Sequence, residues 1–325
     1  RGNSVRGVKV CESLSSGLQL HFMHPPRPSA SVLRSRYTLA TVRSKRRRLP
    51  SETALLDAHG AQVLVLELQG DLRFTAAERI VREISESSAA IGIVLLDFKR
   101  VTRLDPSTIR MLSELARGGA QGGPQIVLTR VRDTELLEAV APLCATEGVA
   151  CVRDELDLGL EWCEQRLLAA GGSAHVLPGI EDLAQHQLCA GLSRSDVGVL
   201  ESMVQAQRFA AGERIVCQGD AADRLYFLMR GEVSVVVPLH DGGHRRLSTL
   251  SPGMGFGEAA LLDAPVRTAD VRCDTEVECW SLSVQHFAAL ERVRPSLMIG
   301  VLRNLLRMAS ETAGRLTSEV AALES

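Results

Sequence analysis

The residues between positions 256 and 269 have the types and spacing needed to hold a phosphate ester. Gly257 lets the backbone approach a ligand closely, because it carries no side chain. Ala259 and Ala260 are small enough to open a short helical turn, and the first N–H groups of such a turn have no intrahelical acceptor and can point at an anion. This segment therefore predicts a phosphate-binding loop.

Three polar side chains accompany that loop. Arg267 offers a rigid guanidinium fork to a phosphate, and Glu258 can accept a hydrogen bond from a sugar hydroxyl. Thr268 adds a hydroxyl directly after the arginine. A simple surface ion pair between Glu258 and Arg267 is the alternative interpretation.

The run from Phe256-Gly257-Glu258 to Arg267-Thr268-Ala269 resembles the phosphate-binding cassette of cyclic-nucleotide-binding domains, F-G-E-x-A-L through R-[AST]-A. The resemblance implies that Glu258 holds the 2′-hydroxyl, Arg267 the cyclic phosphate, and Thr268 a further contact to phosphate or base. It implies cyclic AMP or cyclic GMP as a regulatory ligand, with no cofactor. One departure is that Val266 separates Pro265 from the arginine. The expected nucleotide-binding residues are Gly257, Glu258, Ala259, Ala260, Arg267 and Thr268.

The residues around the cassette predict a small β domain. Short apolar runs between positions 212 and 282 are separated by glycine turns, which is typical of a β-roll or jelly roll, the fold of the family named above. A helix is expected over 194–207, and helices follow from about residue 283. We therefore expect a nucleotide-binding domain over 181–295 and a C-terminal helix over 296–325.

That last helix carries an apolar stripe at alternating steps of four and three residues, the spacing of a coiled-coil seam. The seam can pair with a second chain, which makes a homo-oligomer the expectation, or it can lie on the chain's own domains. Its members are Leu302, Leu306, Ala309, Ala313, Leu316, Val320 and Leu323.

Residues 51–170 alternate between strand-like and helix-like patterns, which predicts an α/β sandwich with a largely parallel sheet. Asp97 ends one such strand, and residues 101–107 lead into a helix. This order resembles the STAS domain of anti-sigma-factor antagonists and sulfate transporters. The resemblance implies a protein partner at this domain and a phosphorylation site at Ser107. The expected strands are 63–68, 91–97, 125–129 and 149–152, and the expected helices are 75–88, 107–116, 135–140 and 156–168.

The segment Asp105-Pro106-Ser107 also has a purely structural interpretation. Asp105 is a favourable N-cap and Pro106 a favourable first helical residue, so the motif can serve only to start a helix. A phosphate on Ser107 would be stabilised by the same helix terminus.

The first fifty residues form a tail. Residues 2–7, 9–15 and 20–22 resemble the C-terminal end of bacterial-type glutaminases, serine amidohydrolases related to β-lactamase folds. We therefore expect 1–23 to be the end of a glutaminase domain whose catalytic serine, lysine and tyrosine lie upstream. Residues 24–50 read as a basic linker, and Gly171-Gly172 opens a second linker over 171–180.

The basic run at 43–48 leaves three interpretations open. It can touch anionic lipid or nucleic acid, form a solvated hinge, or pack on an acidic neighbour. No aromatic residues are interleaved with the arginines, which favours the last two.

The composition disfavours several classes of function. The net charge of −2 gives no nucleic-acid-like field, and no window approaches the roughly 18 consecutive apolar residues of a membrane span. The 8 cysteines show no C-x-x-C spacing, which is typical of reduced thiols and favours a cytoplasmic protein. No catalytic constellation is expected, and His21 and His24 lack the neighbours of a metal site, so no metal is expected.

Three functional classes remain to be compared. We expect a regulatory segment of a glutaminase that presents a STAS module and binds a cyclic nucleotide. The alternatives are the cytoplasmic tail of a sulfate-permease-like transporter and a stand-alone, non-enzymatic signalling protein. A transcription factor is disfavoured, and DNA is not an expected partner, because 296–325 reads as one helical stripe with no helix-turn-helix.

Overall fold

The structure is a computed structural model that describes residues 32–87, 91–144, 150–172, 179–239, 243–262 and 266–324. The described residues from Val32 onward belong to one compact unit. The elements expected within 1–23 lie outside the described residues.

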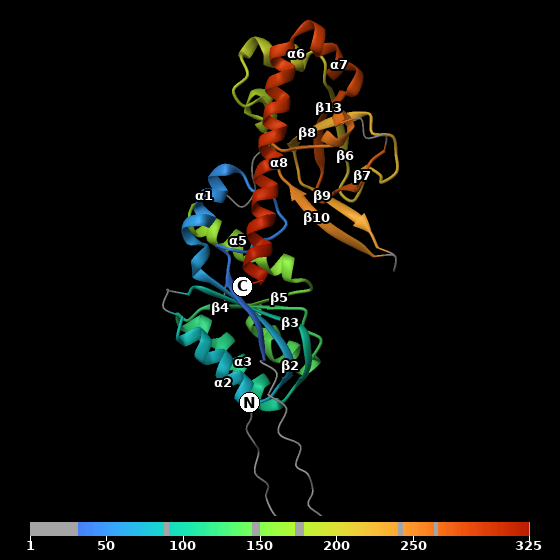
Figure 1. Cartoon of the computed structure of the whole chain (residues 1–325). Coiled ribbons are helices and arrows are strands. Elements are labelled where there is room, and N and C mark those ends of the chain that lie inside the picture. Colours follow the sequence, from blue (N-terminus) through green and yellow to red (C-terminus); the bar gives the residue numbers. More distant parts are fainter. Residues whose placement is uncertain are drawn as a thin grey trace, which may run out of the picture. The chain divides into compact units, whose positions relative to one another are not determined.

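Residues 32–172, here called the α/β domain, form a five-stranded sheet with the order β1-β2-β3-β4-β5 (Figure 1). The strands β2 to β5 are mutually parallel, as the alternation of strands and helices predicts. Consecutive apolar residues in the central strands are buried because helices cover both faces of the sheet. The strands are β1 (Leu33–Thr38), β2 (Val63–Leu72), β3 (Ile93–Leu104), β4 (Gln125–Thr129) and β5 (Ala150–Arg153).

One face of this sheet packs against α2 (Phe74–Ser85), α3 (Pro106–Gly118) and α4 (Thr134–Cys144), which bury residues such as Ile80, Leu112 and Leu136. The other face is covered by α5 (Leu156–Ala170), with α1 (Pro50–His59) beside it. The α/β sandwich with a largely parallel sheet is thus confirmed.

The expected basic linker over 24–50 differs from the structure. Residues Leu33–Thr38 form the edge strand β1, which pairs antiparallel with β2. Helix α1 already begins at Pro50, where Glu52 accepts a hydrogen bond from the Leu49 N–H at 2.9 Å. Polar residues alternate along β1 with only a few apolar ones, so the local pattern is weak and the pairing with β2 decides its conformation.

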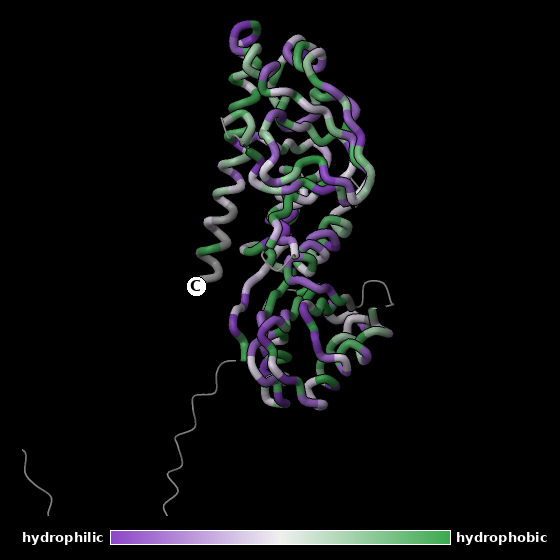
Figure 2. Tube along the Cα trace, turned by 90° about the vertical axis from the view of Figure 1, so that its right-hand side faces the viewer, coloured by the Kyte–Doolittle hydropathy of each residue, from purple (hydrophilic) through white to green (hydrophobic). Residues whose placement is uncertain are grey.

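Residues 179–324, here called the β-roll domain, contain two antiparallel four-stranded sheets with the orders β10-β9-β12-β7 and β11-β8-β13-β6. A buried cluster that includes Val233, Val271 and Cys279 fills the space between them. The expected β-roll is thus confirmed, and hydrophobic segments run through the interior of each domain (Figure 2). The strands are β6 (Gln205–Phe209), β7 (Arg214–Val216), β8 (Arg224–Arg230), β9 (Val233–Pro238), β10 (His244–Leu250), β11 (Gly255–Phe256), β12 (Asp270–Cys273) and β13 (Val277–Ser283).

Helices flank the roll. They are α6 (Arg194–Glu201), α7 (Val284–Val293) and the long α8 (Pro295–Glu324), with the short 3-10 helices η3 (Leu183–Gln185) and η4 (Gln187–Cys189) before them. The helix expected over 194–207 is wrong in its second half, because residues Gln205–Phe209 pair with β13 as strand β6. Gln205 to Arg208 are good helix formers, so the long-range pairing overrides local propensity. None of the described helices is both long enough and apolar enough to cross a membrane.

Candidate functional site

The backbone of the predicted cassette has a conformation that only glycine tolerates at one position. Strand β11 pairs with β8 and ends directly before Gly257, whose φ is +83°. A Cβ atom there would lie 2.9 Å from both the Arg224 carbonyl oxygen and Arg267 Nη1. The short helical turn follows as η5 (Glu258–Leu262), a 3-10 helix. Gly257 is therefore required both by its φ and by the arginine that approaches it.

Arg267 is the buried charge of this site, since only 6% of its surface is exposed. Its Nη1 donates to the Gly257 carbonyl oxygen at 3.3 Å, and its Nη2 donates to Asp223 Oδ1, also at 3.3 Å. The guanidinium carbon lies 5.8 Å from the ring centre of Tyr226, which stacks on Phe256. The cation–π contact and the carbonyl hold the guanidinium beside the cassette backbone.

The main chain of Arg267 is fixed as well. Its N–H donates to the Asp220 carbonyl oxygen at 2.8 Å, and its own carbonyl accepts from Gly219 N–H at 2.9 Å. Three residues later, buried Asp270 accepts from the Gln218 N–H at 2.7 Å. The turn between β7 and β8 thus secures the arginine end of the cassette.

The remaining predicted residues differ in exposure. Glu258 and Thr268 are exposed, Ala259 is half-buried, and Ala260 is buried with its N–H bonded to the Gly257 carbonyl oxygen at 3.1 Å. The structure brings Gly257 and Arg267 into direct contact, and Glu258 and Thr268 follow them in the chain. Pro265 lies outside the described residues.

Two residues of the site were missed by the sequence interpretation. Asp223 supplies a carboxylate to Arg267, and Tyr226 supplies the aromatic face. Burial raises the pKa of the Tyr226 hydroxyl, against a lowering contribution from Arg267, so the ring stays neutral. The position of Asp223, just after the turn Gly219-Asp220 and before a strand, was the signal that could have pointed to it.

The second candidate position, Ser107, lies in a well-formed helix cap. Asp105 accepts from Thr108 N–H at 2.7 Å and from the Ser107 hydroxyl at 3.0 Å, and Phe74 N–H donates to its other oxygen at 3.1 Å. These hydrogen bonds, chiefly that from Thr108 N–H, lower the pKa of Asp105. The helix-starting role of the motif is thus confirmed, and the half-buried Ser107 hydroxyl takes part in it.

Two protein-family models match the chain. The model described as "Cyclic nucleotide-binding domain" covers residues 206–292, and the model described as "Mlab, STAS domain" covers residues 55–145. The first match lies on the β-roll and includes the whole cassette, and the second lies on the α/β sandwich. Both domain classes expected from the residues are therefore borne out.

Among curated proteins, two glutaminases of Bradyrhizobium diazoefficiens resemble most of this chain. Glutaminase 1 is 31% identical over 317 residues, which are 95% of this chain and 50% of the relative. Glutaminase 2 is 29% identical over 305 residues, which are 93% of this chain and 48% of the relative. The chain thus spans about half the length of the curated relatives it matches.

Shorter parts of the chain are similar to other proteins. A CRP-like cAMP-activated global transcriptional regulator of Mycobacterium tuberculosis is 28% identical over 136 residues, which are 42% of this chain and 61% of the regulator. Among solved structures, the catabolite activator protein of Thermus thermophilus is 29% identical, with a TM-score of 0.38, over 42% of this chain and 63% of that chain.

Proposed function

We propose that this chain is a regulatory segment that binds a cyclic purine mononucleotide at the cassette. One observation carries the proposal: a buried guanidinium, that of Arg267, sits against a backbone turn that only Gly257 permits. A buried charge needs a partner of opposite sign, and its present carboxylate partner, Asp223, lies at the long end of hydrogen-bonding distance. A cyclic phosphate meets that need.

The other residues have complementary roles in this proposal. Glu258 accepts from the ribose 2′-hydroxyl, and the backbone N–H groups at the start of η5 face the phosphate. Thr268 contacts phosphate or base. Both cyclic AMP and cyclic GMP fit these roles, and the relative named as cAMP-activated supports the former. The nucleotide acts as a regulatory ligand and not as a cofactor.

We further propose that the intact polypeptide is a glutaminase, converting glutamine to glutamate and ammonia, and that this segment regulates it. The support is that both relatives matching most of the chain are named glutaminases. Those names favour this function over a sulfate-permease-like transporter tail or a stand-alone signalling protein. The α/β domain would serve as a STAS interaction module for a protein partner, with Ser107 as its proposed phosphorylation site.

The cysteines whose side chains are described are all free thiols, which suits a reducing compartment, so the cytoplasm remains the proposed location. They are Cys144, Cys163, Cys189, Cys217, Cys273 and Cys279.

Homo-oligomerisation through α8 is part of the proposal. The inner face of the helix is buried, and Asn304 donates to the Leu188 and Ala190 carbonyl oxygens at 2.9 Å. The outer face exposes Ile299 (55%), Leu306 (68%) and Val320 (55%). These positions, with exposed Ala313 between the last two, are spaced by multiples of seven residues, which suits a second copy of the same helix. Of the sequence-predicted stripe, the side chains of Leu316 and Leu323 lie outside the described set.

Isothermal titration calorimetry of the purified chain tests the nucleotide proposal, with cyclic AMP, cyclic GMP and linear 5′-AMP as ligands. We expect one cyclic nucleotide to bind with a stoichiometry of one per chain, and 5′-AMP to bind much more weakly. Heats indistinguishable from dilution for both cyclic nucleotides would refute it. Sedimentation analysis of the wild type and Leu306→Glu tests the second copy, since the variant should be monomeric at concentrations where the wild type is not.

The glutaminase proposal needs the intact polypeptide. Ammonia release from glutamine is expected from that polypeptide and not from residues 1–325 alone. Ammonia release by these residues by themselves, or no release by the intact polypeptide with or without nucleotide, would contradict it.

A further inference from the structure

The basic run that sequence patterns left open packs on acidic neighbours. Residues 44–48, here called the arginine strap, lie along the outer edge of strand β10. Arg46 forms a parallel β-bridge with Thr249, Arg47 N–H donates to the Thr249 carbonyl oxygen at 2.9 Å, and Thr249 N–H donates to the Lys45 carbonyl oxygen at 3.3 Å. The strap thereby adds a short piece of strand to a sheet of the β-roll domain.

The side chain of Arg46 is buried and has several partners. It is ion-paired with Glu161 of α5 at 3.1 Å and with Glu232, which precedes β9. Its Nη2 also donates to the Ser251 hydroxyl at 2.9 Å. One guanidinium thus joins a helix of the α/β domain to the β-roll domain.

Helix α5 presents a row of three carboxylates to the strap and to β10: Asp157, Glu161 and Glu164. Their spacing of four and three residues places them on one face of the helix. Glu164 accepts from the Ser44 N–H and hydroxyl, both at 2.7 Å, and pairs with Arg48 at 2.7 Å. Because Glu164 is fully buried, its charge depends on these contacts.

A second arginine crosses the same junction directly from the sheet. Arg246 of β10 pairs with Asp157 at 2.6 Å and with Glu161 at 2.6 Å. Lys45 adds to this contact, since its N–H donates to Asp157 at 2.7 Å and its Nζ to the Arg246 carbonyl oxygen at 2.8 Å. The acidic face of α5 therefore has cationic partners from both the strap and strand β10 of the β-roll domain.

Hydrogen bonds connect this junction to the end of the cassette. Strand β12 starts three residues after Arg267 and leads to Asp274, which accepts from the Ser234 hydroxyl at 2.6 Å. The Ser234 and Thr249 hydroxyls lie 3.2 Å apart, and Asp274 N–H donates to the Glu232 carbonyl oxygen at 2.9 Å. Thr249 and Glu232 both contact the strap, so a displacement of β12 acts on two of its partners.

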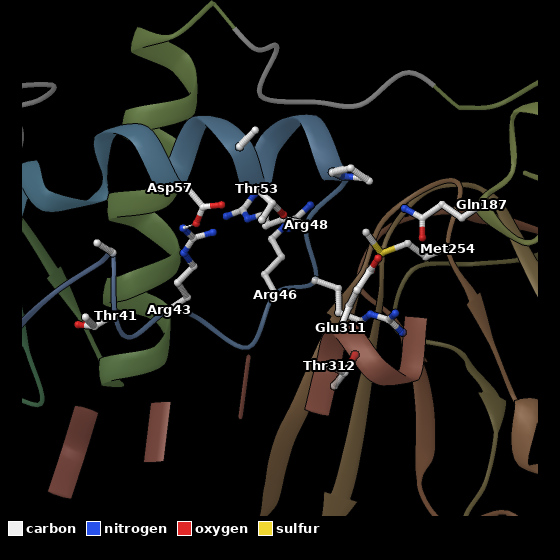
Figure 3. A pocket seen from close by; sticks show the side chains of 14 residues that line it. Thr41, Arg43, Arg46, Arg48, Thr53, Asp57, Gln187, Met254, Glu311 and Thr312 are labelled. Carbon is white, nitrogen blue, oxygen red and sulfur yellow. Dashed lines mark hydrogen bonds and ion pairs between the residues drawn. The ribbon is translucent and has the colours of Figure 1, made fainter. Parts of the chain in front are cut away.

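The strap also borders a cavity of about 530 Å³ that α1 and α8 line as well (Figure 3). Arg43 and Asp57 pair on the α1 side, while Glu311 and Thr312 of α8 and Met254 of the β-roll domain line the opposite side. The strap and α8 therefore line the same cavity.

We propose that the acidic face of α5 is the surface on which the β-roll domain acts when it binds nucleotide, with the arginine strap and Arg246 as the contacts. The inference rests on the proposed nucleotide binding and names the first target of the signal, the α/β domain of the same chain. Buried ion pairs are favourable only in good geometry, so small shifts of β9 and β10 change their free energy. Coupling of this kind is reciprocal: what nucleotide does to the junction, the junction does to nucleotide affinity.

Calorimetry on variants of the full 325-residue chain tests the coupling. Arg246→Gln and Glu161→Gln should each change cyclic-nucleotide affinity by at least about five-fold. The double variant should change it by less than the two single effects combined, because both remove the same pair. Arg208→Gln is the matched control, since it removes an exposed ion pair to Glu278 within the β-roll domain, and should leave affinity within about two-fold of wild type.

Hydrogen exchange provides a second readout, first on the wild-type chain and then on Arg246→Gln. Saturating nucleotide should change amide exchange in residues 157–164 as well as in the cassette, and Arg246→Gln should abolish the change only in 157–164. If Arg246→Gln fails to fold, Glu232→Gln serves instead, because Arg46 keeps Glu161 and Ser251.

The outcomes separate the two claims. Nucleotide binding with unchanged exchange in 157–164 and unchanged affinity in folded variants would overturn this inference and leave the proposed function standing. A wild-type chain that binds neither cyclic nucleotide would overturn both.

Discussion

Two buried arginines in this chain are partnered in opposite ways. Arg267 in the cassette and Arg46 in the strap are about equally buried, at 6% and 8% exposure. Arg46 is satisfied by two carboxylates and a hydroxyl, of which Glu161 and Ser251 are themselves buried. Arg267 has a backbone carbonyl and the carboxylate of Asp223, a side chain that is 62% exposed, each at 3.3 Å.

The difference separates the proposed binding site from a structural joint. Burying a guanidinium is costly unless it is paired, so a buried arginine with long, exposed partners is prepared for an anion that arrives from outside. A buried arginine with short, internal partners has no capacity left for a ligand. The exposed fractions of the two side chains do not distinguish them; their partners do.

The largest expected effect is the loss of Arg46. Arg46→Ala should lower the free energy of unfolding by about 3–5 kcal/mol, because it breaks the ion pairs of a buried guanidinium: buried Glu161 keeps only Arg246 as a cationic partner, and Glu232 loses its cation. Adding Glu232→Gln should recover part of the loss. Urea unfolding followed by circular dichroism measures both, with Arg208→Ala, at an exposed position, expected to change stability by less than about 1 kcal/mol. A loss for Arg46→Ala as small as that of the control would break the comparison.

A third buried basic side chain, His186, extends the comparison because its imidazole is neutral near pH 7. Burial lowers the pKa of His186 to about 4, from an ordinary value of 6.5, while its Nδ1 accepts from Leu188 N–H at 3.1 Å. The unfolded chain then binds the proton more tightly. The neutral His186 therefore makes its full contribution to the free energy of unfolding above pH 6.5. As the pH is lowered toward 4, the free energy of unfolding should fall by about 3 kcal/mol.

The measurement is unfolding free energy at several pH values between 7 and 4. In His186→Asn, whose amide oxygen can replace Nδ1 as the acceptor, stability should fall less over this range. An identical slope in wild type and variant would show that His186 does not govern the acid sensitivity.

Replacing Arg267 should act on binding and leave the fold nearly intact. Arg267→Ala removes a charge-assisted contact to phosphate worth about 1.5–3 kcal/mol, a roughly ten- to hundred-fold loss of cyclic-nucleotide affinity by calorimetry. Its unfolding free energy should change far less than that of Arg46→Ala, since the partner left behind, Asp223, is exposed. Equal affinities for wild type and variant would contradict the proposal that Arg267 binds the cyclic phosphate.

The smallest expected effect concerns Asp223 itself. In the proposed site its carboxylate competes with the ligand phosphate for Arg267, and an ion pair of this exposure is worth about 0.2–1 kcal/mol. Asp223→Asn should therefore raise cyclic-nucleotide affinity by roughly two- to five-fold. A fall in affinity in the same titration would mean that Asp223 positions the arginine instead of competing for it.

Much of the site followed from local spacing. The small residues and the arginine of the cassette lie within fifteen positions, so their order alone predicted the glycine turn and the short helix that follows it. The burial of Arg267 was not predicted from this order. The partners of that arginine were not predictable in the same way. Asp223 and Tyr226 lie more than forty positions away and reach Arg267 only because β8 pairs with β11.

The same division holds for the fold. Alternating apolar runs determined the parallel sheet and the β-roll, since burial of such runs on one or both faces leaves few other arrangements. The edge strands β1 and β6 have weak patterns of their own and form because a neighbouring strand offers free hydrogen-bonding groups.

Local sequence was enough to predict the chemistry within each segment: a candidate phosphate-binding loop, a helix cap at Asp105, and a cluster of positive charge at 43–48. It could not predict which opposite charges meet that cluster. Glu161, Glu164 and Glu232 lie more than a hundred residues beyond the strap, and folding brings them to within contact of its arginines. Coulomb attraction depends on distance and burial, neither of which is written in local sequence, so the run at 43–48 became a joint between domains only once its partners were in place.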